Sequence, residues 1–427
     1  MPTPVPPLPC PPPAAVEDAP SEETTSGPGH RLRITLLMAG SCLPILGAVL
    51  IAPVLPQMQD HFADVPGAAA LVPMALTVPA LSLALLAPFA GVIVDRIGRK
   101  RLLVIATVLY AVLGTAPLWL DSLGAIVVSR ALVGVAEAAI MTCCTTLIGD
   151  YYSGRQRDRY LGMQTMCASI SATAFFALGG AAGSAGWRTP FWAYAVSLLL
   201  APAMAALLPK PRPAAHTNES LPTAAELVSR PFPWRPLAGT CALTVFGAVL
   251  FYAVQVEMSF LLDDMGVTDP GMIGLVLAAS SVATVTGAGV FTKLGRSPAA
   301  RMPAVFAVCA LGFAVIWLAP NPVVLTIGAV ISCFGGGVML PSLLTLAMSK
   351  LQYADRGRGT GLWTGSFFIG QFICPLVVLG LTSTVGSMAG AMGALAVAGA
   401  AGAAGLSLFS RRRQSVTVPE PIEQLAR

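Results

Sequence analysis

The sequence predicts an all-α membrane protein, with twelve transmembrane helices arranged as two pseudo-symmetric six-helix bundles. Three observations favour this fold class. The chain has 427 residues, of which 55% are hydrophobic and only 11% are charged, a balance that soluble domains of this size rarely show. Apolar runs of about 20 residues, long enough for a helix to cross a bilayer core, recur along the chain. A polar, Pro-rich break separates six of these runs from six more.

Each run is expected to form one membrane-spanning helix, and short polar turns are expected to join the helices. In chain order the predicted spans are residues 34–56, 68–94, 102–120, 122–148, 160–184, 189–208, 237–262, 271–293, 302–319, 322–348, 359–382 and 387–409.

The segments outside these spans complete the expected domain organisation. Residues 1–33 are rich in Pro and are expected to be a disordered cytoplasmic tail. They do not open with a basic segment and an apolar core, so they do not resemble a cleavable signal peptide. Residues 34–208 form the first predicted bundle and 209–236 the linker. Residues 237–409 form the second bundle, and 410–427 form a second tail.

The basic residues predict the orientation. Twelve spans put both termini on one side, and 23 of the 25 Lys and Arg residues fall on that side. Arg188 lies in an opposite turn, and Arg130 lies within a span. Because cytoplasmic turns are rich in Lys and Arg, both termini are expected in the cytoplasm. The formal net charge of +5 is then a topology signal, and no nucleic-acid partner is expected.

The two halves resemble each other. Residues 45–58 and 245–258 are identical at six of fourteen positions, with an offset of 200. RDRYLG at 157–162 aligns with RGRGTG at 356–361, and DRIGR at 95–99 has a counterpart, TKLGR, in the second half. Parallel repeats of this kind normally enclose a binding site at the middle of the membrane.

At this point two motifs carry a family resemblance. The turn after the second span has the form G-x-x-x-D-R-x-G-R-K and consists of Gly91, Asp95, Arg96, Gly98, Arg99 and Lys100. The fourth span has the form R-x-x-x-G, with Arg130 and Gly134. With these motifs, residues 34–409 resemble the major facilitator superfamily. GWRTPFW at 186–192 and GQFICP at 370–375 are similar to segments of its twelve-span drug:proton antiporters.

The resemblance implies roles for several residues. Asp95 would dock at the start of the eleventh span, near residues 359–361, where a helix N-terminus stabilises a carboxylate by about 0.3–1 kcal/mol. Arg99 would pair with Asp150 at the end of the fourth span, and these contacts would close the cytoplasmic gate. Arg130 would take part in proton coupling. Residues 175–186, FFALGGAAGSAG, lack the Pro of the antiporter motif in span 5, so uptake by symport stays open beside export.

Ionisable residues deep within spans are expensive, about 2.5–3.5 kcal/mol on insertion scales, and therefore indicate function. Three are well inside: Arg130, Glu137 and Glu257. Arg130 and Glu137 lie seven residues apart, two turns along one helix face. Glu137 is the expected carrier of the coupling proton, and the alternative is a buried structural role for the pair. Glu257 either lines the outer mouth of the cavity or extends to the membrane interface.

Polar and aromatic side chains on several spans are candidates for the substrate cavity: Gln57, Gln164, Tyr252, Gln255, Trp363, Phe367 and Gln371. The cysteines show no CxxC pair and no spacing suited to a metal, so neither a metal nor a cofactor is expected. No catalytic motif indicates an enzyme. The expected function is proton-coupled efflux of small amphipathic neutral or cationic compounds from a bacterial inner membrane, by a monomer. The alternatives are uptake of a small organic solute and, in another class, a sensor that transports nothing.

Overall fold

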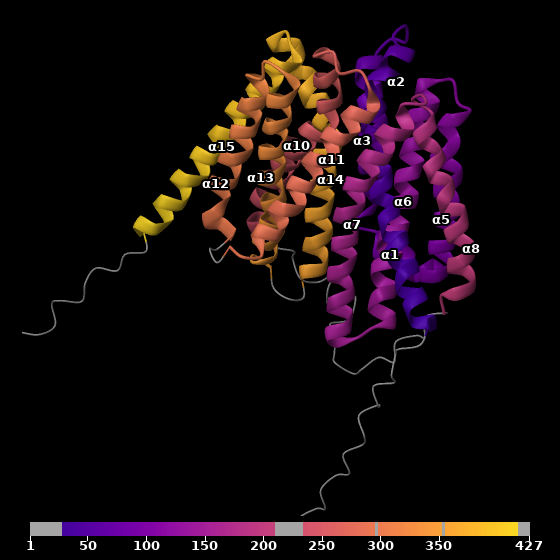
Figure 1. The fold of residues 1–427 in the computed structure, drawn as a ribbon. Helices are drawn as coiled ribbons and strands as arrows, with labels where there is room; N and C mark the ends of the chain where they lie inside the picture. The colour runs from indigo at the N-terminus through magenta and orange to yellow at the C-terminus, as the bar shows by residue number, and fades with distance from the viewer. Residues whose placement is uncertain (1–27, 210–233, 295–297, 352–354, 417–427) are drawn as a thin grey trace, which may run out of the picture.

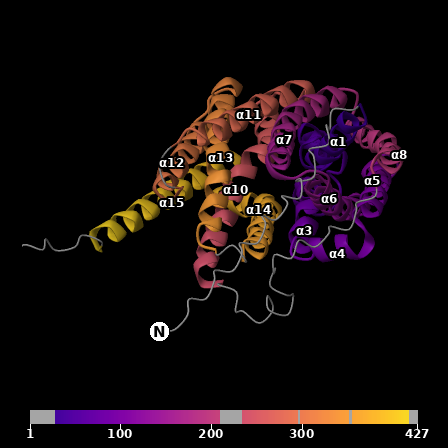
Figure 2. The ribbon, with the colours of Figure 1, turned by 90° about the horizontal axis from the view of Figure 1, so that it is seen from below.

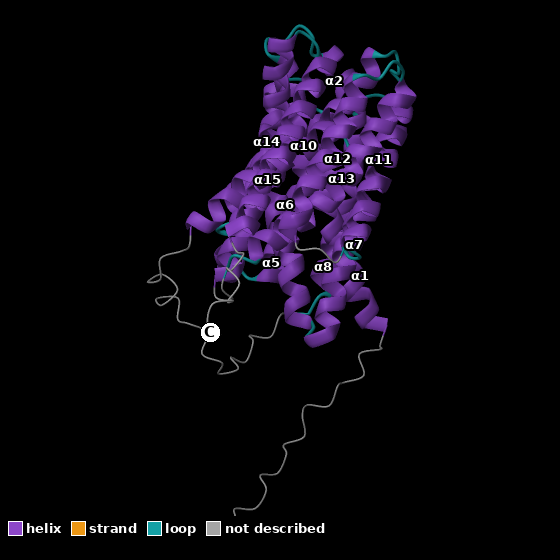
Figure 3. Ribbon diagram, turned by 90° about the vertical axis from the view of Figure 1, so that its left-hand side faces the viewer, coloured by secondary structure: helices purple, strands orange, loops and turns teal. Residues whose placement is uncertain are grey.

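The computed structural model describes residues 28–209, 234–294, 298–351 and 355–416, and every regular element in these ranges is a helix (Figure 3). Helices α1 to α8 gather on one side of the molecule and α10 to α15 on the other (Figure 1). Twelve helical segments are long and apolar enough to cross a membrane. The predicted all-α fold with twelve spans is therefore confirmed.

The first half contains the elements of six spans. They are α1 (Pro28–Val49), η1 (Ala52–Val54), α2 (Leu55–His61), α3 (Ala68–Leu86), α4 (Ala90–Ile97), α5 (Arg99–Thr115), η2 (Ala116–Leu118), α6 (Leu123–Tyr151), α7 (Gly154–Gly183), η3 (Thr189–Val196) and α8 (Ser197–Leu207).

The second half contains one long helix for each span. They are α10 (Trp234–Asp264), α11 (Pro270–Phe291), α12 (Pro298–Trp317), α13 (Pro322–Met348), α14 (Arg356–Val385) and α15 (Met388–Val416). Several helices overrun the predicted limits: α1 begins before residue 34, α10 before 237, and α15 continues past 409. Polar residues can extend a helix beyond the membrane, so apolar length alone underestimates these helices.

The first two spans are broken, which differs from the prediction of continuous helices. The first span passes from α1 through the 3-10 turn η1 into α2, where Pro53 and Pro56 supply no backbone N–H for a helical ladder. The expected span 68–94 divides into α3 and α4, with Pro88 between them. Proline therefore sets both breaks.

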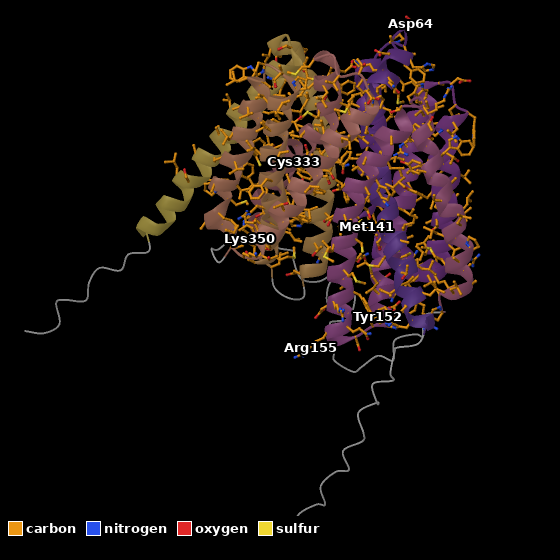
Figure 4. The ribbon with its side chains drawn as sticks, in the orientation of Figure 1. Asp64, Met141, Tyr152, Arg155, Cys333 and Lys350 are labelled. Carbon is orange, nitrogen blue, oxygen red and sulfur yellow. The ribbon has the colours of Figure 1, made fainter. Side chains whose placement is uncertain are left out.

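The two halves meet along two pairs of helices. Seen from below, α7 lies beside α11 and α3 beside α14 (Figure 2). Asp64 and Arg155 mark opposite ends of the bundle (Figure 4), and we name these ends the α2 end and the Arg155 end. In α7 the buried residues are Phe176, Gly179, Gly180 and Gly183, all in the half nearer the α2 end.

A close contact, which we name the α2-end seal, joins the halves. Its residues are Ala52, Gly180 and Gly183 of the first half and Ser259, Pro270 and Gly274 of the second. A Cβ on Gly180 would lie 2.9 Å from the Cα of Gly274, so the two backbones touch. Ser259 Oγ donates to the Ala52 carbonyl at 2.6 Å. The seal uses the small residues of the 175–186 segment.

Candidate functional site

Arg130 of α6 is fully buried, with 0% of its surface exposed. Its Nη2 donates to the Gly47 carbonyl of α1 at 2.8 Å, and its Nε donates to the Ala75 carbonyl of α3 at 3.3 Å. The guanidinium carbon lies 5.1 Å from the centre of the Tyr194 ring of η3, a cation–π distance. Arg130 thus connects four elements of the first bundle.

The local structure explains why these carbonyls are available. Gly47 lies in the last turn of α1, where carbonyls lack helical donors. Pro79 has no N–H to donate to the Ala75 carbonyl four residues before it. Hydrogen bonds to a charged group contribute about 1.5–3 kcal/mol each, so the two bonds offset part of the cost of burying the guanidinium.

Glu137, two turns after Arg130 on α6, is 2% exposed. A Cβ placed on Gly47 would overlap Glu137 Oε1 and would lie 3.4 Å from Tyr110 Oη. The carboxyl group, the Tyr110 hydroxyl and the backbone of Gly47 therefore converge, while Tyr110 itself donates to the Leu43 carbonyl at 2.5 Å. Glu137 Oε1 has no hydrogen-bond partner among the described residues.

The structure therefore brings Arg130 and Glu137 to the same residue of α1. Arg130 binds the carbonyl of Gly47, and Glu137 lies against its Cα. Within the described part of the chain no ion pair joins the two side chains. Both are enclosed within the first bundle, so they do not line an open cavity in this state.

Glu257 of α10 lies near the α2-end seal, two residues before Ser259. Its side chain is 3% exposed. Burial does not fit the alternative in which this side chain extends to the membrane interface, because an extended carboxylate would be solvated.

The predicted cavity residues fall into separate groups. Tyr252 of α10 and Trp363 of α14 both pack on Phe367, with ring centres 5.6 and 5.9 Å apart. Gln164 of α7 donates to Ser41 Oγ at 2.8 Å and to Thr145 Oγ1 at 3.2 Å.

The other three predicted cavity residues are glutamines. The Oε1 atoms of Gln57 and Gln371 are buried without partners among the described residues, and Gln255 is half-buried. A hollow of about 250 Å³ between α3, α10 and α14 contains none of the seven. Its lining residues are Ala87, Pro88, Trp234, Gly357, Arg358, Gly361 and Leu362. One common cavity for the seven therefore stays a prediction.

The residues of the predicted gate surround the turn between α4 and α5. Gly98 has φ +93°, a conformation that favours glycine. Arg99 forms an ion pair with Asp150 at the end of α6, and Lys100 Nζ donates to the Leu208 carbonyl at the end of α8, at 2.5 Å. Arg96 is exposed.

The predicted docking element for Asp95 is the start of α14. The surroundings of Gly91 and the side chain of Asp95 lie outside the described residues. At this end of α14, a Cβ on Gly361 would lie 3.8 Å from the carbonyl of Ala87, which lies between α3 and α4. The latch role of the turn stays a prediction.

Sequence reasoning missed four residues of the site: Gly47, Pro79, Tyr110 and Tyr194. Gly47 does lie in the repeated segment 45–58, where an identical glycine in both halves was a signal. No pattern in the sequence points to the two tyrosines, because each approaches α6 from another helix.

Comparison with known proteins adds the family. Residues 37–354 match the model of the Major Facilitator Superfamily. An alignment of 257 residues is 28% identical to protein spinster homolog 3 of Danio rerio and covers 55% of this chain and 50% of that protein. Another, of 170 residues, is 30% identical to the class C tetracycline resistance protein of Escherichia coli and covers 38% and 41%. The chain thus matches about half the length, or less, of these two relatives.

The fold is similar to that of a bacterial homologue of the human lysosomal transporter Spinster, solved in an inward-facing and occupied conformation. The TM-score is 0.75 at 16% identity, and the match covers 90% of this chain and 98% of that one. At this identity the likeness establishes the fold alone.

Proposed function

The chain belongs to the Major Facilitator Superfamily, and from this premise we propose that it is a proton-coupled exporter of small amphipathic compounds, neutral or cationic. Transport would occur by alternating access, with the two halves rocking about a central site. The closed α2-end seal supports an inward-facing state, in which a substrate enters from the Arg155 end.

The observation that carries the proton coupling is the buried carboxyl group of Glu137, whose Oε1 has no hydrogen-bond partner among the described residues. Burial in a low dielectric favours the neutral form of a carboxyl group, and a nearby cation favours the charged form. Movement of Arg130 relative to Glu137 during the cycle therefore provides a physical means to take up and release a proton. The three His residues are at positions 30, 61 and 216, outside the predicted spans, so imidazole does not offer the same means.

The direction of transport has a specific experiment. In inside-out vesicles with an acidic interior, an exporter that exchanges substrate for protons accumulates its substrate inside. We expect tetracycline or ethidium, used as probes, to accumulate and to leak out when a protonophore collapses the gradient. Vesicles without the protein are the control. Gradient-driven movement of the probe out of the vesicles would instead support uptake by symport, and equal signals with and without the protein contradict the proposal.

The resistance protein among the relatives supports export over uptake. The missing Pro of residues 175–186 weakens the likeness to antiporters, which is why the vesicle experiment includes the symport outcome.

We also propose that the protein is a monomer in a bacterial inner membrane, with the Arg155 end in the cytoplasm. The distribution of Lys and Arg supports this orientation. A cysteine in place of Asp64, in a background without other cysteines, should react with an impermeant thiol reagent on whole cells, whereas one in place of Arg155 should not. The two positions lie at opposite ends (Figure 4), so the reversed pattern contradicts the orientation.

A further inference from the structure

The hydrogen-bond ladder of α3 is interrupted at Pro73 and Pro79. In an α-helix the N–H of each residue donates to the carbonyl four residues earlier, and proline has no N–H. Pro79 therefore leaves the carbonyl of Ala75 without its helical donor. Ala75 is fully buried, and an unsatisfied buried acceptor costs about 1–3 kcal/mol.

Arg130 supplies the missing donor from another helix. Its Nε lies 3.3 Å from the Ala75 carbonyl oxygen. One turn later on α6, Gly134 lies against the backbone of Pro79: a Cβ on Gly134 would be 2.6 Å from the Cα of Pro79. The R-x-x-x-G motif thus fits this kink with both of its defined residues, since the arginine satisfies the freed carbonyl and the glycine admits the bent backbone.

Two unsatisfied atoms remain next to this arrangement. Arg130 Nη1 and Glu137 Oε1 are both buried and have no hydrogen-bond partner among the described residues. Opposite charges on one face of α6 attract each other across the two turns that separate them. Here the guanidinium is instead held by the carbonyls of Gly47 and Ala75.

We propose that Pro79 is a positioning residue for proton coupling: by freeing the Ala75 carbonyl it docks Arg130 on α3 and keeps the guanidinium from pairing with Glu137. The inference rests on the proposed proton role of Glu137. Two groups compete for the guanidinium of Arg130. The Ala75 carbonyl, which has no helical donor in α3, binds it, and the Glu137 carboxylate would otherwise attract it.

Few other titratable groups of the described residues lie close enough to Arg130 and Glu137 to influence the charge of the pair. Tyr110 from α5 and Tyr194 from η3 are the titratable side chains that act on the pair. At the guanidinium, α1 and α3 present backbone carbonyls. Neither tyrosine supplies a cation, so Arg130 is the cation that acts on the buried Glu137 carboxyl group.

Pro79→Ala tests the proposal because alanine restores the N–H. The Ala75 carbonyl can then accept a bond from its own helix, which turns it along the α3 axis and away from α6. Arg130 loses its Nε partner and can approach Glu137. A closer cation favours the carboxylate, so protonation of Glu137 should require a lower pH.

The measurement is a pH titration of the carboxyl C=O stretch by infrared difference spectroscopy on the purified protein in lipid. Comparison with Glu137→Gln assigns the Glu137 band. We expect Pro79→Ala to move its midpoint toward acid by about one pH unit, a tenfold change in proton affinity. Pro73→Ala is the matched control, because it makes the same change in the same helix six residues away, and should leave the midpoint in place.

A second measurement tests whether Pro79 acts through Arg130. In an Arg130→Gln background, Pro79→Ala should cause no further shift, whereas independent effects would add. An unshifted midpoint in folded Pro79→Ala, an equal shift in Pro73→Ala, or additive shifts in the double variant would overturn the proposal. Pro79→Gly repeats the test with a smaller side chain. Failure of both Pro79 variants to fold would make the proline a folding element and would also overturn it.

The titration needs no substrate, so it separates this inference from the proposed function. A shifted midpoint in a protein without gradient-driven flux supports the positioning role and contradicts the exporter. Gradient-driven flux in a protein whose midpoint is unshifted supports the exporter and contradicts the positioning role of Pro79.

Discussion

The two halves of the molecule build the same contact from different side chains. In the first half, Gly47 of α1 faces Glu137 of α6. In the second half, Gly247 of α10 faces Met339 of α13, and a Cβ on Gly247 would lie 3.1 Å from its Sδ. The carboxyl group of Glu137 in the first half thus occupies the same place as the thioether of Met339 in the second.

The neighbouring helix crossings repeat the comparison. Gly134 lies against the backbone of Pro79 in the first half, and Gly337 lies against the backbone of Thr284 in the second. Threonine keeps its N–H, so α11 needs no external donor where α3 does, and α13 carries no charged residue along its length. The comparison indicates that the duplicated packing is a scaffold. At these crossings the buried charges, Arg130 and Glu137, belong to the first half, whereas the buried Glu257 of the second half lies near the α2-end seal.

The largest expected effect comes from removing the charge that distinguishes the halves. Glu137→Gln keeps the shape of the protonated side chain but cannot release a proton. We expect loss of transport driven by a pH gradient, while downhill exchange of the probe continues. Glu257→Gln in the second half is the matched variant. If Glu257→Gln abolishes gradient-driven transport and Glu137→Gln does not, the proton site lies beside the α2-end seal.

The second largest effect is expected from substitution of the two corresponding glycines, Gly47 and Gly247. In Gly47→Ala the new methyl group collides with the Glu137 carboxyl group, whereas in Gly247→Ala it meets a flexible methionine. We expect Gly47→Ala to lower gradient-driven transport at least tenfold, about 1.4 kcal/mol, and Gly247→Ala to lower it less than threefold. Initial rates at equal protein level are the measurement, and equal losses would mean that the contact matters only for packing.

A smaller effect is expected at the ends of the first half. Two ion pairs join described residues to one another, Arg99 with Asp150 and Arg188 with Asp121, and both belong to this half. Exposed pairs of this kind contribute about 0.2–1 kcal/mol. If the turn after α4 is a latch, Asp150→Asn should slow transport about threefold, whereas Asp121→Asn should not. Identical rates for both variants would reduce the Arg99 turn to an orientation signal.

The smallest effect is expected at Tyr194 of the first half, whose ring faces Arg130. The helix α13 of the second half carries no charged residue that an aromatic ring could face in the same way. The Tyr194 ring lies at cation–π distance from Arg130, and its hydroxyl has no partner among the described residues. Tyr194→Phe keeps the ring, so we expect rates within twofold of the parent. Tyr194→Leu removes the ring and should have the larger effect. A greater loss in Tyr194→Phe would give the hydroxyl a role that the geometry does not indicate.

Sequence reasoning reached the fold because the length of an apolar run and the placement of Lys and Arg are local properties. It also found Arg130 and Glu137, because charge within a span is visible without a structure. It did not find what the charges touch. That Arg130 docks where Pro79 frees a carbonyl depends on which turn of α6 crosses which turn of α3, and no single segment encodes this crossing.

The broken first span shows the same limit. Pro53 and Pro56 are plain in the sequence, yet hydropathy does not register them, because proline interrupts a hydrogen-bond ladder without making the segment polar. To predict a break in a span from the sequence, missing backbone N–H donors must therefore be considered separately from the polarity of the side chains.

The α2-end seal has a consequence for inhibition. The contact between Gly180 and Gly274 is made by backbone atoms, and the proposed alternating access would require it to open and close. A small molecule that wedges between α7 and α11 would block closure. Resistance usually arises by placing a bulkier side chain where the inhibitor binds, but at these two positions any added side chain would itself hold the halves apart. The seal is therefore a target with little room for escape mutations.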